Sequence, residues 1–171
     1  MSLAAAKAQA LDLLEREYRV LEQLIASLTP EQLELPVFTG EGQGWRVRDL
    51  IAHFADWQSL SARTAEKIAA DGVAPDEKAG MLAFLGVEPL TDARNEETFR
   101  QWRGRPVADA CTHLLACHRR LMDAVRALPP ERIVKSDAPE DWYRYFWMPG
   151  LRHLRIHREH IEAAVKESAT K

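Results

Sequence analysis

The sequence has few cysteines and no long apolar run, and both absences limit the classes of protein to which it can belong. Only two of its 171 residues are cysteines, Cys111 and Cys117. Their spacing of six points the side chains in different directions on a helix, which argues against a mutual disulfide and against a cysteine-type zinc site. No apolar stretch approaches the roughly 20 residues that a membrane helix needs, and no leader pattern marks the N-terminus. We therefore expect a cytoplasmic protein without a membrane partner.

A strong charge of one sign is also absent. The chain carries 23 lysines and arginines against 26 aspartates and glutamates, a net charge of −3. Because no basic stripe with interleaved aromatic residues accompanies this balance, nucleic acid is not expected as a partner. Apolar residues make up 46% of the chain, which is enough for a real core. The length predicts one domain that spans residues 1–171.

Strand-like alternation is absent as well, whereas apolar residues recur at helical spacing in several segments. The pattern predicts helices over about residues 4–28, 46–70, 92–102, 107–128 and 149–166. Glycine and proline predict a loop over residues 36–44 and a long irregular connection over residues 71–90, which is a candidate functional loop. We therefore predict an all-α fold, a four-helix bundle with a long connection between its second and third helices.

The histidines are distributed unevenly. Three of the six, His153, His157 and His160, lie within eight residues, and His53 lies a hundred positions upstream of His153. On a helix, residues four apart such as His153 and His157 share one face, with their Cβ atoms about 5–6 Å apart. One more histidine from a facing helix would complete three neutral nitrogen donors around a divalent ion. Three donors leave a position for water or substrate, as in catalytic metal sites.

A solvated stripe of histidines among arginines is the alternative interpretation of this segment. The apolar residues Leu154 and Ile161 in the same segment favour instead an orientation of the histidines toward the core. His53 lies in an apolar run three positions after Leu50, so we expect it to face inward. A buried neutral imidazole needs a partner, and a metal ion is one such partner. The two histidines of the predicted helix 107–128, which lie five positions apart, are not expected to take part in the site.

Several residues are candidates for supporting roles near the upstream histidine. Asp49 lies four positions before it and Asp56 three after it, so either carboxylate could orient its second nitrogen, unless both are ordinary surface groups. Trp57, one turn further on, either packs in the core or forms the wall of an apolar pocket. Trp142 and Tyr145 belong to an aromatic cluster before the last helix, where they either cap the core or line the mouth of a pocket.

The segment Gly44–Trp57 reads Gly-Trp-Arg-Val-Arg-Asp-Leu-Ile-Ala-His-Phe-Ala-Asp-Trp. It resembles the second-helix signature of the DinB-like superfamily. The resemblance extends to Leu28–Leu33, to Arg94-Asn95, to Leu128–Glu131 and to the histidine-rich final helix, and so covers nearly the whole chain. The chain is similar to small four-helix proteins of the DinB/DfsB type and to the N-terminal domain of mycothiol-dependent maleylpyruvate isomerase.

This resemblance implies a four-helix bundle that holds a divalent metal, often zinc or nickel, through His53, His153 and His157. It also implies a homodimer, because members of the superfamily often dimerise. His160 stands where several relatives carry another residue. The ligand pair on the last helix could therefore be His157 with His160, or His160 could support a ligand from behind.

Two functions remain open from the sequence. The first is a divalent-metal-dependent enzyme that acts on a small-molecule substrate, either by thiol transfer with a low-molecular-weight thiol or by hydrolysis. The second is a non-catalytic bundle that binds and sequesters a small molecule, and a metal-free structural bundle is a third interpretation. The sequence offers no strong general base beyond Glu159 and Asp49, so no catalytic residue is assigned.

Overall fold

The computed structural model describes residues 1–37, 44–76, 80–87 and 91–170, and over these residues the chain is helical without an extended strand. The long helices are α1 (Leu3–Ser27), α3 (Val47–Asp71), α6 (Val107–Ala127) and α8 (His153–Ser168). The shorter elements are α2 (Pro30–Leu33), α4 (Gly80–Leu85), α5 (Thr91–Trp102), η1 (Pro130–Arg132), α7 (Arg144–Phe146) and the π-helical η2 (Trp147–Arg152). The predicted all-α class is confirmed. Most of the predicted loop 36–44 lies outside the described residues.

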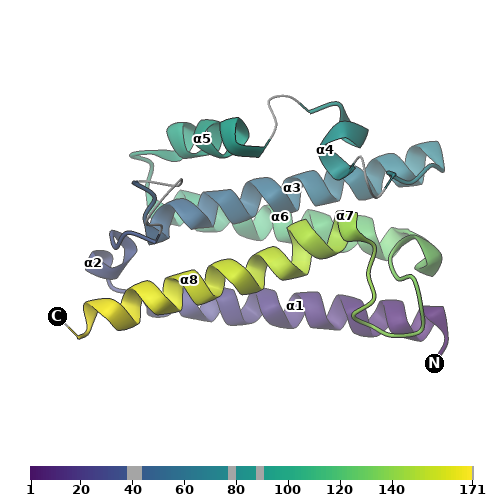
Figure 1. Cartoon of the computed structure of the whole chain (residues 1–171), viewed down its shortest axis with the longest axis horizontal. Helices are drawn as coiled ribbons and strands as arrows, with labels where there is room; N and C mark the ends of the chain where they lie inside the picture. Colours follow the sequence, from purple (N-terminus) through teal and green to yellow (C-terminus); the bar gives the residue numbers. More distant parts are fainter. Residues whose placement is uncertain (38–43, 77–79, 88–90, 171) are drawn as a thin grey trace.

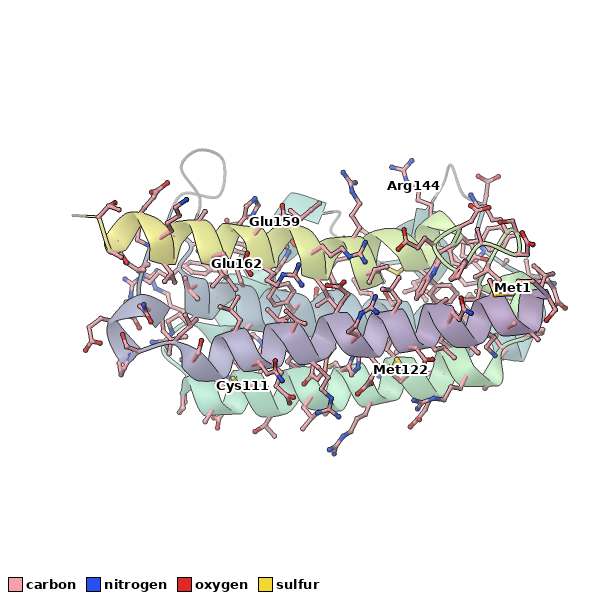
Figure 2. All side chains as sticks on the ribbon, turned by 90° about the horizontal axis from the view of Figure 1, so that it is seen from below. Met1, Cys111, Met122, Arg144, Glu159 and Glu162 are labelled. Atoms are coloured by element: carbon pink, nitrogen blue, oxygen red, sulfur yellow. The ribbon has the colours of Figure 1, made fainter. Side chains whose placement is uncertain are left out.

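The four long helices lie alongside one another (Figure 1). Helix α3 packs against α6 and α8, and α1 contacts the same two helices. Figure 2 shows α1 passing between α8 and α6, with Met1 at one end and with Cys111 and Met122 on α6. Helices α4 and α5 lie against the outer side of α3. Among the helices of the described ranges, none combines the length and the apolar character that a membrane span requires.

Helix α1 follows directly from its sequence pattern. The Ser2 side chain accepts a hydrogen bond from the Ala5 backbone N–H at 3.2 Å, which caps the first turn. Leu14, Tyr18 and Leu21 recur at helical spacing, and each is at most 2% exposed. The helix therefore buries one apolar face against its neighbours and leaves the other face to solvent.

The orientation of α8 about its own axis is fixed by both apolar and polar contacts. Leu154 and Ile161 are buried in the core. On the side facing α1, Glu17 accepts hydrogen bonds from Arg155 at 3.0 Å and from Arg158 at 2.7 Å. One half-buried carboxylate therefore holds two arginines of α8. This anchoring directs the histidines of α8 toward α3.

The connection between α3 and α5 is more ordered than its sequence predicts, because it contains helix α4. Met81, Leu82, Phe84 and Leu85 pack against the core, and Gly86 with a φ of 61° ends the helix. The Gly86 N–H donates to the Ala83 carbonyl at 3.1 Å, and the Val87 N–H donates to the Leu82 carbonyl at 3.0 Å. The expectation of an irregular segment over 71–90 was therefore wrong for these residues. Glycines on either side of an apolar run can mark the two ends of a short helix as readily as they mark a loop.

The last helix also starts differently from the prediction. The backbone is already helical at Arg144, and it widens to the π form between Trp147 and Arg152 before α8 begins at His153. Pro149 lies inside this wide turn. Because proline has no N–H to donate to the preceding turn, it disturbs the regular α-helical ladder at this point. The π-helical turn lies immediately before the first histidine of α8.

Candidate metal centre

Three imidazoles meet between α3 and α8. His53 comes from the second turn of α3, and His153 and His157 come from the first two turns of α8. One ring nitrogen from each of the three residues lies within 4.8 Å of the others. The Nε2 atoms of His53 and His153 are 2.7 Å apart. Within the described ranges, no other three histidine, cysteine or acidic side chains come together in this way.

The three nitrogens fit a divalent ion such as zinc. Zinc–nitrogen bonds of about 2.0–2.1 Å in tetrahedral geometry separate two ligand nitrogens by about 3.3 Å. The observed 2.7 Å between the Nε2 atoms of His53 and His153 is shorter than this separation by about 0.6 Å. Small side-chain rotations would make up this difference. The donors are all imidazole nitrogens, a ligand type that suits zinc and nickel.

The surroundings of the three histidines keep their rings neutral. His53 is only 4% exposed, and its pKa lies well below the ordinary value because of burial and the nearby His153 and His157. Burial lowers the pKa of His153 to about 4. Burial and the neighbouring His153 and His160 lower the pKa of His157 to about 3. At neutral pH each ring therefore retains a lone pair, which is the form that metal ions bind.

Two tryptophans enclose the histidine cluster. Trp57 lies 6.2 Å from His53 and 5.2 Å from His153 between ring centroids. Trp45 meets the His53 ring edge-on at 5.1 Å. Sequence reasoning names Trp57 as either a core residue or a pocket wall but misses Trp45, because Trp45 precedes α3 and shares no helical periodicity with His53. Only its place in the Gly-Trp signature could have indicated it.

The second nitrogen of His53 is not held by a carboxylate. Its Nδ1 is buried and has no hydrogen-bond partner among the described residues. Asp49 instead accepts the Arg46 backbone N–H at 2.8 Å at the start of α3, and burial raises the pKa of this carboxyl group. Asp56 accepts a hydrogen bond from Arg94 at 2.7 Å. The structure thus directs both predicted orienting carboxylates elsewhere, and the ring of His53 is positioned by aromatic packing.

His160 lies next to His157 on the same helix. The Nδ1 atoms of the two rings are 3.1 Å apart. His160 is not one of the three residues whose nitrogens cluster. This geometry favours a supporting role behind His157, and the alternative pairing of His157 with His160 as ligands stays a prediction.

Trp142 and Tyr145, the two residues predicted to line a pocket mouth or to cap the core, are buried. The Trp142 indole N–H donates to the carbonyl oxygen of Pro139. The Tyr145 hydroxyl donates to the carbonyl oxygen of Arg132 at 3.2 Å. Both contacts hold the segment between η1 and α7 against the core. A role for this pair at a pocket mouth stays a prediction.

The two remaining histidines lie on α6, outside the cluster. His113 stacks on Trp102 with their ring centroids 5.1 Å apart. His118 is buried, and its ring nitrogens lie 3.1 Å from a carboxylate oxygen of Glu15 and 3.2 Å from the amide oxygen of Gln58. His118 therefore joins α6 to α1 and α3 through polar contacts inside the core.

Comparison with known proteins adds a family match to this geometry. A family model described as the mycothiol maleylpyruvate isomerase N-terminal domain matches residues 14–149. The matched range contains His53 and ends before His153 and His157. No curated protein and no solved structure gives a significant match.

Proposed function

The chain belongs to the mycothiol maleylpyruvate isomerase N-terminal domain family, a DinB-like family, and on this premise we propose that it is a divalent-metal-dependent enzyme acting on a small molecule. We assign residues 1–171 to one domain, whose four long helices form the four-helix bundle of that superfamily. The observation that carries the proposal is the convergence of His53, His153 and His157 within 4.8 Å.

The three histidines are assigned as the metal ligands. His53 and His153 present their Nε2 atoms to each other. Nδ1 of His157 faces His160, so we assign Nε2 of His157 to the metal. A divalent ion held there would supply a Lewis acid, which would lower the pKa of a water or thiol at the site. Trp45 packs against His53, and Trp57 packs against His53 and His153, so the two tryptophans restrict how these two rings rotate.

Thiol transfer is the version of this chemistry that we place first, with hydrolysis second. The family description names mycothiol, a low-molecular-weight thiol. Cys111 and Cys117 both lie on α6, and burial raises the pKa of each thiol. Because a raised pKa disfavours the reactive thiolate, the chain's own cysteines are poor nucleophiles. A thiol cosubstrate would supply the sulfur nucleophile instead.

The metal content of the purified protein tests this proposal. We expect near-stoichiometric zinc, nickel or another divalent metal in the wild type and in His113→Ala, and no retained metal in His153→Ala. His113 is the matched control because it lies on α6, outside the cluster. Equal metal content in the two variants would disprove the ligand assignment.

The metal-loaded protein is then assayed for transfer of a thiol to small electrophiles and for hydrolysis of small esters and amides. Activity that is lost in His153→Ala would support the enzyme. Binding of small molecules without turnover by the loaded protein would instead favour sequestration, the other function that the sequence left open.

A further inference from the structure

A pocket of about 240 Å³ lies where the beginning of α3 meets the end of α5. Three arginines, Arg46, Arg48 and Arg103, line it, and Phe99 forms an apolar part of its wall. Asp49 is the one acidic residue among the described residues of the lining. We call this feature the arginine pocket.

The positive charge of the arginine pocket is only partly compensated. Glu34 pairs with both Arg46 and Arg48, so a single carboxylate faces two guanidinium groups. Asp49 is engaged by the backbone N–H of Arg46. Within the described part of the chain, Arg103 has no carboxylate partner. Three positive charges thus face two negative ones, in a protein whose overall net charge is −3.

The side chains around the arginine pocket are held in place by their neighbours. Arg48 donates a hydrogen bond to the carbonyl oxygen of Arg105 at 2.5 Å, which ties α3 to the segment after α5. The guanidinium of Arg103 lies 5.5 Å from the centroid of the Phe99 ring. Phe99 in turn stacks on Trp45 at 6.0 Å. Because Arg48 and Phe99 are held by these contacts, they lose little side-chain freedom when a ligand binds.

We propose that the arginine pocket binds a small oxyanion, namely a phosphate or carboxylate group. The planar fork of a guanidinium group matches the oxygens of both, and such charge-assisted hydrogen bonds are among the stronger ones in proteins. Arg48 is already engaged by Glu34 and by a backbone carbonyl. Arg46 is engaged by the same Glu34 carboxylate, so Arg103 supplies the direct donors, and Arg46 and Arg48 add their charges. The small volume suits one such group rather than a large ligand.

The arginine pocket is separate from the metal centre. Phe99 lines the pocket and stacks on Trp45, and Trp45 contacts His53. The three clustered histidines do not line the pocket. An oxyanion in the pocket is therefore not a metal ligand, and this inference stands whether or not the protein holds a metal.

Calorimetric titration of the whole protein with inorganic phosphate and with succinate tests the inference. The variants are Arg103→Gln and its control Arg100→Gln, since Arg100 lies on the last turn of α5, three residues before Arg103, but pairs with Glu97 at 2.7 Å. We expect the dissociation constant of the preferred ion to rise about tenfold or more in Arg103→Gln, as the loss of a charge-assisted hydrogen bond predicts. Arg100→Gln should bind like the wild type. The ion that binds more tightly identifies the class as phosphate or carboxylate.

The same titrations in the His153→Ala background separate this site from the metal centre. Binding that persists there and still depends on Arg103 supports the arginine pocket, even if the proposed metal function fails. Three results would overturn the inference: binding of neither ion by the wild type, equal binding by wild type and Arg103→Gln, or binding that disappears with His153→Ala alone. Because Arg103 is exposed, its replacement is not expected to impair folding.

Discussion

The indole N–H of Trp57 donates a hydrogen bond to the side-chain oxygen of Asn95 at 3.3 Å, which joins α3 to α5 beside the histidine cluster. The two residues that precede this pair form a second connection. Asp56 on α3 accepts two hydrogen bonds from Arg94 on α5, at 2.5 and 2.7 Å. Among the described side chains of α5, only Thr98 is buried. Two polar side-chain pairs therefore join α5 to α3, in addition to the partly buried Phe99 and Trp102 that pack against the core.

Replacing Asp56 with Asn should loosen α5 without unfolding the protein. The change removes one partner of a partly buried, bidentate ion pair, a local loss of about 1–3 kcal/mol. We expect amide hydrogen exchange in residues 93–102 to accelerate roughly tenfold or more, with smaller changes in the core helices. Glu97→Gln, which removes an exposed pair within α5, is the control and should leave the exchange rates unchanged. Equal rates in the two variants would show that other contacts hold α5.

The metal-free protein should lose stability as the pH falls below about 6.5. The folded-state pKa values of about 4 for His153 and about 3 for His157 lie below the unfolded value near 6.5. Between these values the unfolded chain binds more protons than the folded one. Each such histidine therefore lowers the free energy of unfolding by up to about 1.4 kcal/mol per pH unit. The contribution of each neutral histidine to stability is fully present above pH 6.5, and it is lost as the pH falls toward the folded-state pKa.

Urea unfolding of chelator-treated protein at pH 7, 6 and 5 measures this decline. His153→Asn removes one of the groups that resist protonation in the folded state, so its stability should fall less steeply with pH. Parallel curves for the wild type and His153→Asn would show that the fold does not oppose protonation of His153.

Lys7, which lies on α1, should stabilise the C-terminal end of α6. Its Nζ donates to the carbonyl oxygen of Arg126 at 2.7 Å and also to that of Leu128, two acceptors at the end of this helix. Lys7→Met keeps the aliphatic stem but removes both hydrogen bonds, and we expect a loss of about 1–2 kcal/mol in the free energy of unfolding. Lys67→Met, which removes an exposed pair with Asp71, should change it by less than about 0.5 kcal/mol. Denaturant melts of the two variants would decide the matter, and similar losses would refute the capping role.

His160→Asn distinguishes the two roles open to His160. If His160 supports His157 from behind, the variant should still bind one metal per chain with affinity weakened about 10–100-fold. If His160 is itself a ligand, the variant should lose metal as completely as His153→Ala does. Competition with a chromophoric chelator measures both stoichiometry and affinity.

The long helices and the histidine face could be predicted from the sequence because both depend on local spacing. Apolar residues at helical periodicity mark α1, and the spacing of four places His153 and His157 on one face of α8. The inward position of His53 follows from its apolar neighbours. Each of these inferences needs only residues within a turn or two of one another.

The features that sequence reasoning missed depend on competition between partners. Asp49 has the right spacing to orient His53, yet its carboxylate accepts a hydrogen bond from the Arg46 backbone N–H at the start of α3. Asp56 is likewise taken by Arg94, which is 38 residues away in the chain. Trp45 reaches His53 from outside the helical register. Spacing shows which contacts are available to a side chain, and only the folded structure shows which partner it binds.

The donors of the candidate metal centre come from positions a hundred residues apart, since His53 and His153 meet across that length of chain. No local segment contains all three histidines, so a partly folded chain in which α3 or α8 is undocked offers two adjacent imidazoles at most. Bringing the ends of such a long loop together carries a large entropic penalty and delays contacts of this kind during folding. Tight coordination would therefore arise only after the whole topology has closed, and metal uptake would report completion of folding.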